Sequence, residues 1–271
     1  MSKPIRVALS GSGFRLGAHL GALQAIADAG FEVVELAGTS GGSIIASLFA
    51  SGMPLEVLSH LCMSLDWSPM MTFSAWTLIT KQSLCSGDVL LQYLGNLTDH
   101  KTFADLDVDL KVIASDLLTE KEFLFSKATT PDAQIALAAR ASASIPVVFT
   151  PVPYQNVLCV DGGCCDNIPA SALTVDDVPR VGIYLESDDA PLLPGAYGIA
   201  TLAPRMIDLL LASNETSHVE LDSKNGAQII RVPTGFASSF DRNMPAATRQ
   251  KLYDVGYAAT AASLKTSPVT V

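Results

Sequence analysis

Residues 33–52 read VVELAGTSGGSIIASLFASG, and this stretch decides the fold class. The apolar run Val33–Thr39 has the length and composition of a buried strand, and Gly41–Ala50 has those of a buried helix that Gly52 ends. Between the two runs lies a sharp corner in which glycines surround Ser40. A strand that turns directly into a helix is typical of a parallel sheet covered by helices. The stretch therefore predicts an α/β fold.

The same alternation continues on both sides of this corner. We expect further strands at Arg6–Ser10, Leu110–Ser115, Glu122–Phe125, Val157–Val160, Val181–Leu185 and Ile229–Val232. We expect helices at Ala18–Ala29, from Pro54 onward, and at Pro131–Ala141, Leu202–His218 and Pro245–Leu264. No linker or change in composition divides the chain. The sequence therefore predicts a single domain, residues 1–271, with three α/β/α layers and a mainly parallel central sheet.

The charge balance argues against nucleic acid as a partner. The chain carries a net charge of −10, and an acidic surface repels phosphate backbones. Charged residues make up 16% of the chain, against a typical value of about 25%. That composition fits a large core or an apolar face that contacts other molecules. We expect any contact with a membrane surface to be transient and hydrophobic, because a chain this acidic is not attracted to anionic lipids.

The cysteines and the first residues favour a cytoplasmic protein. We also expect it to associate peripherally with membranes. The five cysteines are odd in number and show no metal-ligand spacing. Adjacent Cys164 and Cys165 are poorly placed to bridge each other, so free thiols in a reducing compartment are expected. The chain starts without the apolar segment of a signal peptide. We expect no metal and no other cofactor.

Ser40 is a candidate nucleophile because of its neighbours. Gly38, Ser40 and Gly42 form a G-x-S-x-G pattern, in which small residues let a tight strand-to-helix turn project the serine beyond the sheet edge. The turn also places Ser40 at a helix N-terminus, which favours a developing negative charge. A plain tight turn is the alternative. A phosphate-binding P-loop is not, since its G-x-x-x-x-G-K-[ST] pattern is absent.

A second glycine-rich segment, SGSGFRLGAH at residues 10–19, follows the first predicted strand. Adjacent parallel strands end at the same edge of a sheet, so this loop should face the corner at Ser40. The backbone N–H groups of Gly11–Phe14 are then candidates for stabilising an oxyanion. A dinucleotide-binding loop is the alternative, but Leu16 stands where that fingerprint needs its third glycine, and Gly17 follows it.

Two bases are compatible with the residues. Asp161 lies in LCVDGGCCDNIP, residues 158–169, at the end of a predicted strand. Desolvation in an apolar cleft would make this carboxylate more basic, and contact with Ser40 would let it take the proton directly. A plain turn aspartate before two glycines is equally compatible with the spacing. The alternative is a Ser40–Asp161–His218 triad, which has the chain order of α/β-hydrolases, although the polar surroundings of His218 favour a helix cap. We expect His19 to make a structural hydrogen bond.

Together these motifs resemble the patatin-like phospholipase family. That family combines a glycine-rich oxyanion loop, a G-x-S-x-G elbow and a downstream D-G-[GA], and it uses a Ser–Asp dyad without a catalytic histidine. The matching stretches run in the family's order over about residues 5–185. They are SGSGFRLGAHLGALQAI (10–26), GTSGG (38–42), VIASDLLTEKEFLFS (112–126), RASASIPVVFTPV (140–152) and VDGGCCDNIP (160–169).

The resemblance implies a role for each matching residue. It implies Ser40 as the nucleophile and Asp161 as the general base. It implies an oxyanion hole in the loop of Gly11, Ser12, Gly13, Phe14 and Arg15. It implies support for this geometry from Gly38, Gly41, Gly42, Gly162 and Gly163. Two positions depart from the family, because Ser12 replaces a usual glycine and Leu16 with Gly17 replaces the usual glycine at position 16.

We therefore expect a serine acyl hydrolase of the lipase, phospholipase A or lysophospholipase type, and the resemblance makes lipids or lysolipids its substrates. Because the glycine-rich loop departs from the family pattern, a protein that is not an enzyme is the alternative: a catalytically silent lipid-binding or interaction module on the same fold. The stretch 65–84, which carries Trp67 and Trp76, fits neither a regular strand nor a regular helix. A lid that contacts lipid and a buried core segment are both compatible with it.

Overall fold

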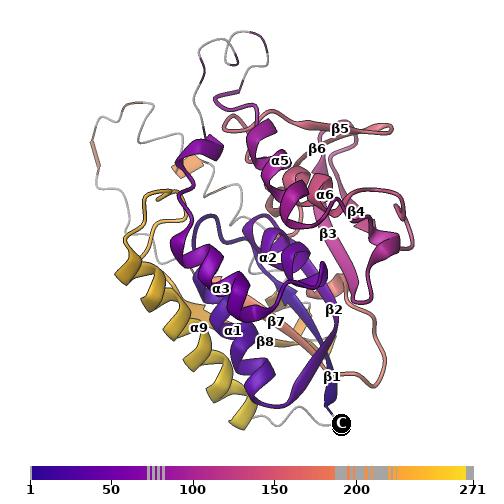
Figure 1. Cartoon of the computed structure of the whole chain (residues 1–271), viewed down its shortest axis with the longest axis vertical. Helices are drawn as coiled ribbons and strands as arrows, with labels where there is room; N and C mark the ends of the chain where they lie inside the picture. Colours follow the sequence, from indigo (N-terminus) through magenta and orange to yellow (C-terminus); the bar gives the residue numbers. More distant parts are fainter. Residues whose placement is uncertain are drawn as a thin grey trace.

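The computed structural model describes residues 2–71, 74, 77, 80, 83–186, 194–195, 198, 205–206, 209, 219–220, 222–223 and 225–266. Within them, eight strands form one mixed sheet in the order β5–β6–β3–β2–β1–β7–β8, with β4 paired to β3 (Figure 1). The strands are β1 Lys3–Leu9, β2 Phe31–Thr39, β3 Asp109–Asp116, β4 Lys121–Ser126, β5 Val152–Tyr154, β6 Val157–Asp161, β7 Arg180–Glu186 and β8 Gln228–Pro233.

Parallel pairing runs through β3, β2, β1, β7 and β8, whereas β4, β5 and β6 are antiparallel to their neighbours. The helices are α1 Leu16–Asp28, α2 Gly41–Ala50, α3 Leu55–Ser64, α5 Asp88–Leu97, α6 Ile135–Ser142 and α9 Ala246–Thr266. The prediction of an α/β fold with a mainly parallel central sheet is confirmed.

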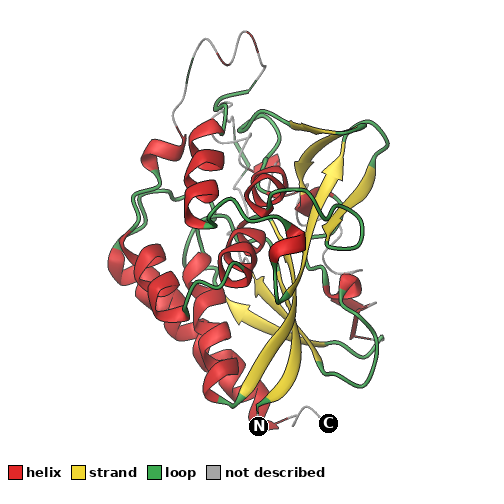
Figure 2. Ribbon diagram, turned by 45° about the vertical axis from the view of Figure 1, so that its right-hand side comes forward, coloured by secondary structure: helices red, strands yellow, loops and turns green. Residues whose placement is uncertain are grey.

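The central strands are apolar because both faces of the sheet are covered. Val7 and Leu9 of β1 belong to the large core cluster that the helices cover. Their neighbour Ala8 points to the opposite face, where it packs against Ala170 and Leu173. This two-sided burial explains why β1 and β2 read as continuous apolar runs rather than as alternating patterns. Figure 2 shows the long helices gathered on one side of the strands.

The long C-terminal helix α9 lies directly against α1, whose first residue follows the glycine-rich loop (Figure 1). Glycines allow this close approach. A Cβ atom on Gly21 would lie 2.0 Å from the carbonyl oxygen of Tyr253, and one on Gly256 would lie 2.0 Å from that of Ala18. The C-terminal part of the chain therefore supports the element that positions the glycine-rich loop.

One expected helix needs correction, and one helix was not expected. The helix predicted to begin at Pro131 begins at Ile135, because the preceding backbone pairs elsewhere: Phe103 N–H donates to the Ala133 carbonyl at 3.1 Å. The helix α5, Asp88–Leu97, was not predicted. The helix expected at Leu202–His218 lies almost wholly outside the described residues. No helix in the described part of the chain is both long enough and apolar enough to cross a membrane.

Candidate active site

The corner at Ser40 is a strained elbow between β2 and α2. Ser40 has φ 50° and ψ −125°, a positive-φ conformation that serine rarely adopts. Its glycine neighbours allow the turn. A Cβ atom on Gly38 would lie 2.7 Å from the Cα of Ser43, and one on Gly42 would lie 2.4 Å from the carbonyl oxygen of Leu9. The G-x-S-x-G spacing is thus required by backbone packing on both sides of the serine.

The sheet brings Asp161 directly to Ser40. The last residue of β2, Thr39, pairs with Ile113 of β3. The next residue of β3, Ala114, pairs with Asp161 at the end of the antiparallel strand β6. The ends of β2 and β6 therefore meet on one edge of β3. Across this junction the Ser40 hydroxyl donates a hydrogen bond of 2.7 Å to Oδ2 of Asp161.

Burial makes Asp161 more basic than an ordinary aspartate. Its side chain is fully buried, and this raises its pKa from 3.8 to about 6 because the charged form is desolvated. The hydrogen bonds from the Ser40 hydroxyl and from the Gly163 N–H, the latter 2.9 Å long, oppose this rise. The carboxylate is ionised at neutral pH, yet it is a better proton acceptor than in water.

The glycine-rich loop lies against the first turn of α2. A Cβ atom on Gly41 would lie 2.2 Å from Oγ of Ser12 and 2.6 Å from the carbonyl oxygen of Gly13. Gly13 has φ 53°, whereas Ser12 does not have a positive φ, so the serine that replaces a family glycine is not strained. Leu16, the other departure, begins α1 and lines the pocket at Ser40.

The backbone N–H groups of this loop divide into two kinds. Three are used to hold the loop: Gly11 donates to the Asn167 carbonyl at 2.9 Å, Phe14 to the Ser239 carbonyl at 2.9 Å, and Arg15 to the Ser12 carbonyl at 3.0 Å. Among the described residues, no acceptor lies within reach of the N–H groups of Ser12 and Gly13. Of these two donors, the N–H of Gly13 belongs to a residue that lines the pocket at Ser40.

The side chain of Arg15 also supports the loop. It is buried, and it donates from Nε to the Ser12 carbonyl at 3.2 Å and from Nη1 to Oγ1 of Thr234 at 2.9 Å. The loop is thereby fixed to the residue that follows β8.

No histidine among the described residues hydrogen-bonds to Ser40 or Asp161. His19 is fully buried on α1, where its Nε2 lies 2.8 Å from the carbonyl oxygen of Ser10, and burial lowers its pKa to about 4. It is neutral and donates to Ser10, which is the structural role expected from the sequence. His60 and His100 are exposed. His218, the alternative base, lies outside the described residues.

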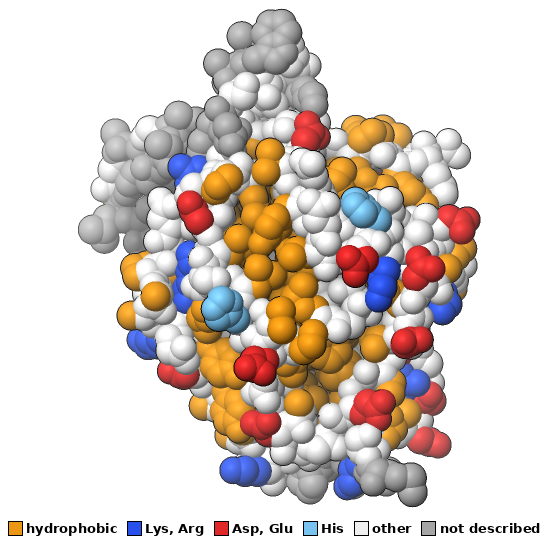
Figure 3. All heavy atoms as spheres, viewed as in Figure 1, with side chains coloured by type: hydrophobic (Ala, Val, Ile, Leu, Met, Phe, Trp, Pro, Cys, Tyr) orange, Lys and Arg blue, Asp and Glu red, His pale blue; other side chains and the backbone are white. Residues whose placement is uncertain are grey.

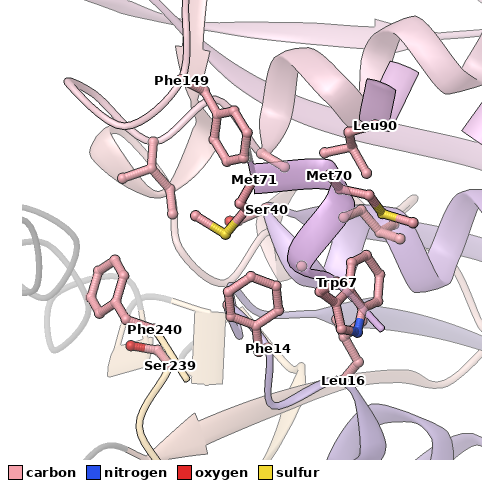
Figure 4. A pocket seen from close by; sticks show the side chains of 15 residues that line it. Phe14, Leu16, Ser40, Trp67, Met70, Met71, Leu90, Phe149, Ser239 and Phe240 are labelled. Carbon is pink, nitrogen blue, oxygen red and sulfur yellow. The ribbon is translucent and has the colours of Figure 1, made fainter. Parts of the chain in front are cut away.

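Ser40 lies in an apolar pocket with a cavity volume of about 50 Å³ (Figure 4). Its roof consists of Trp67, Met70 and Met71, together with Ser239 and Phe240 from the loop between β8 and α9. Phe14, from the glycine-rich loop, packs against Trp67 with ring centroids 5.7 Å apart. The other lining residues are Gly13, Leu16, Gly41, Ile44, Leu90, Ala143, Ile145 and Phe149.

Residues 67–71 thus belong to the site, and Trp67, Met70 and Met71 are buried. Trp76, the other tryptophan of the stretch 65–84, lies outside the described residues. The pocket also contains residues that the sequence analysis did not single out. Ser239 and Phe240 come from a loop without any catalytic motif, and only the tertiary structure brings them to Ser40.

A family model for patatin-like phospholipases matches residues 7–174, and the chain belongs to this family. Protein R571 of Acanthamoeba polyphaga mimivirus is 28% identical over 272 residues, which cover 92% of this chain and 90% of that protein. A probable lipid hydrolase, 463L of invertebrate iridescent virus 6, is 29% identical over 177 residues, which cover 59% of this chain and 60% of that protein.

Solved structures show the same fold. The crystal structure of VipD from Legionella pneumophila superposes with a TM-score of 0.65 at 18% identity, over 98% of this chain and 67% of that one. The match extends beyond the residues covered by the family model. Family membership supports lipid hydrolysis as the general activity.

Proposed function

We propose that this protein is a serine acyl hydrolase that cleaves lipid acyl esters, phospholipids or lysophospholipids above all, with Ser40 as nucleophile and Asp161 as general base. The observation that carries the proposal is the 2.7 Å hydrogen bond from the Ser40 hydroxyl to a fully buried carboxylate. A strained elbow, a base in contact with the nucleophile and N–H donors in the adjacent glycine-rich loop are the parts that acyl transfer requires.

The first half of the reaction forms an acyl-enzyme. The Ser40 oxygen attacks the ester carbonyl carbon while Asp161 takes the hydroxyl proton. The N–H groups of Ser12 and Gly13 stabilise the oxyanion, helped by the positive end of α2. When the tetrahedral intermediate collapses, the ester C–O bond breaks and the protonated Asp161 gives its proton to the departing alkoxide.

The second half uses the same groups. Asp161, again ionised, takes a proton from a water molecule that attacks the acyl-enzyme carbonyl, and the oxyanion forms in the same place. Collapse releases the fatty acid, and the proton on Asp161 returns to the Ser40 oxygen. No further base enters either half.

The pocket is suited to the acyl chain of the substrate. Nearly all of its lining side chains are apolar, and Ser40 lies at its floor (Figure 4). A cavity of about 50 Å³ holds only a few water molecules and is far smaller than a fatty acyl chain. A fatty acyl chain therefore enters only if roof side chains move, and Met70 and Met71 have the flexible, unbranched side chains that allow this.

We place the protein in the cytoplasm, with transient contact to lipid surfaces. The contact is hydrophobic, because the net charge of −10 disfavours anionic membranes. Figure 3 supports an apolar contact: on the face it shows, hydrophobic side chains gather over α3 and α5, and acidic side chains are scattered around them.

The test is hydrolysis of p-nitrophenyl butyrate and of a lysophosphatidylcholine, in EDTA, by the wild type and three variants. Ser40→Ala and Asp161→Asn should each lower kcat about 10³-fold or more, because both remove a group that acts in the transition state. His218→Ala should retain activity, as should the wild type in EDTA. A fluorophosphonate probe should label the wild type at Ser40 and leave Ser40→Ala unlabelled.

Each alternative makes a different prediction. Loss of activity in His218→Ala would establish a triad instead of the dyad. Loss of activity in EDTA would require a metal that the proposal does not include. A folded wild type that neither hydrolyses an ester nor reacts with the probe would be a silent lipid-binding module.

A further inference from the structure

The C-terminal end of α6 contacts the backbone of both proposed catalytic residues. The N–H of Ser40 donates to Oγ of Ser142 at 2.8 Å, and the N–H of Asp161 donates to the carbonyl oxygen of Ser144 at 2.9 Å. Ser142 and Ser144 are both fully buried. The segment Ser142–Ser144, called the clamp below, thus holds two residues from opposite sides of the sheet junction.

The contact at Ser142 satisfies a donor that the elbow itself leaves unpaired. Ser40 is the N-cap of α2, and it lies one residue beyond Thr39 and Ile113, the last pair in the ladder between β2 and β3. A buried N–H without an acceptor costs free energy, so the Ser142 hydroxyl stabilises the strained conformation that projects the nucleophile.

A buried arginine fixes the other end of the clamp. The guanidinium of Arg140 is 2% exposed, donates from Nη1 to the Ser144 hydroxyl, and lies 5.0 Å above the Phe149 ring of the pocket. It also donates to three carbonyl oxygens from two other segments, those of Ser86 at 2.8 Å, Gly87 at 3.1 Å and Thr150 at 3.0 Å.

These contacts of Arg140 connect the clamp to the walls of the pocket. Burial lowers the pKa of Arg140 to about 10, so the side chain remains charged at neutral pH. The guanidinium of Arg140 is rigid and charged, and its several hydrogen-bond partners together fix its position. Through its bond to the Ser144 hydroxyl, Arg140 connects the residue that holds the Asp161 backbone to the segments at Ser86 and Thr150.

We propose that the clamp sets the distance between Ser40 and Asp161, with Ser142 as the positioning residue for the nucleophile and Arg140, acting through Ser144, as the positioning residue for the base. This inference rests on the proposed function, because it concerns the geometry of that reaction. Neither residue touches substrate. Each holds the backbone of one member of the dyad, and a misplacement of about 1 Å in such a pair can cost about 100-fold in rate.

The test compares Ser142→Ala with Ser47→Ala. Ser47 is a matched control, because it is a buried serine on α2 whose hydroxyl has no partner among the described residues. Ser142→Ala should lower kcat for p-nitrophenyl butyrate, and the rate of fluorophosphonate labelling, by about 10- to 100-fold. KM should stay within about twofold of the wild-type value. Ser47→Ala should leave all three unchanged within about twofold.

Amide hydrogen exchange, followed by NMR, measures how well the clamp protects the Ser40 and Asp161 amides, and it needs no substrate. In Ser142→Ala the Ser40 amide should exchange at least about tenfold faster, while the Asp161 amide should keep its protection. Arg140→Lys keeps the positive charge but loses the planar guanidinium that donates to several partners at once. It should speed exchange at Asp161 more than at Ser40, and it should move the acidic limb of the pH–rate profile to lower pH, since a loosened Asp161 is better hydrated.

The outcomes separate this proposal from the proposed function. If the wild type is active and Ser142→Ala matches Ser47→Ala in kcat, the clamp is structural only and the positioning role is wrong. Unchanged exchange at Ser40 in Ser142→Ala would overturn the contact itself. If the wild type shows no esterase activity or labelling, the proposed function fails, while the exchange measurements still decide whether the clamp holds the two backbones.

Discussion

The floor of the pocket and its roof are built in contrasting ways. At the floor, Ser40 and Asp161 are fixed by hydrogen bonds of 2.7 to 2.9 Å to each other, to the Ser142 hydroxyl and to the backbone of neighbouring segments. Glycines at Gly38, Gly42 and Gly162 let these segments approach so closely that a Cβ atom at any of them would lie less than 3 Å from backbone atoms. Here close backbone packing and hydrogen bonds define the geometry.

The roof depends on large apolar side chains instead. Trp67, Met71 and Phe240 come from two segments that are joined at their edges by polar contacts. Ser68 donates to Asn243 at 2.9 Å, and Arg242 donates to the Met71 carbonyl at 3.1 Å. The difference matches two requirements: acyl transfer needs fixed distances between reacting groups, whereas an acyl chain needs a surface that adapts to it.

The rigidity of the floor is tested most severely by Gly42→Ala. The added methyl group would lie 2.4 Å from two backbone carbonyl oxygens, those of Leu9, the last residue of β1, and of Ser10, which follows it. We expect a loss of about 3 kcal/mol of unfolding free energy, measured by urea denaturation, together with a loss of esterase activity in the folded fraction.

Gly52→Ala is the control for this variant. Nothing lies within 4 Å of its added methyl group, and only its φ of 95° is unfavourable for alanine. It should cost about 1 kcal/mol and leave the activity of the folded protein unchanged. Equal losses of stability in the two variants would mean that close backbone packing at the elbow is not what requires glycine.

The buried carboxylate at the floor gives a second prediction, which concerns pH. Because the folded-state pKa of Asp161, about 6, lies above the unfolded value of 3.8, this group favours the folded state at low pH. That contribution is lost as the pH rises through about 6, and at about 1.4 kcal/mol per pKa unit it amounts to about 3 kcal/mol. The activity should change in the opposite direction and rise through about pH 6, since only the ionised carboxylate accepts the Ser40 proton.

Asp161→Asn separates these two effects, because its side chain is neutral at every pH. The variant should be inactive, and its unfolding free energy relative to wild type should increase by about 3 kcal/mol between pH 4 and pH 8. Urea unfolding of both proteins at a series of pH values measures this difference. A difference that does not vary with pH would show that ionisation of Asp161 has no net cost in the folded protein.

Most of the floor could be predicted from the sequence, because its function depends on local backbone geometry. Glycines at fixed offsets from Ser40 and Asp161 mark the turns, and the apolar runs before them mark the strands. The same holds for the sheet: the strand predicted at Val33–Thr39 is the core of β2, Phe31–Thr39. Where local pattern and tertiary pairing disagree, as at Pro131, the sequence misplaced the start of a helix.

The roof and the clamp could not be predicted in this way. Ser142 lies 102 residues from Ser40 in the sequence, and nothing in its neighbours indicates that its hydroxyl meets the Ser40 N–H. Phe240 belongs to a loop with no recognisable motif. Side chains that act by filling space can be replaced by others of similar size, so they leave little pattern to read. The helix α5 is different, since Leu90 and Leu94 have helical spacing that the sequence analysis overlooked.

The roof gives the smallest predicted effect. Phe240→Ala should leave kcat/KM for p-nitrophenyl acetate within about twofold of wild type, because the dyad and the glycine-rich loop are unchanged. For p-nitrophenyl octanoate we expect a loss of about 3- to 10-fold, since removing about 40 Å² of apolar contact to the chain is worth about 1 kcal/mol. Phe236→Ala is the matched control, because Phe236 is 40% exposed and does not line the pocket. An equal loss on both esters in Phe240→Ala would mean that the roof supports the catalytic geometry itself, and the contrast between a rigid floor and an adaptable roof would then be wrong.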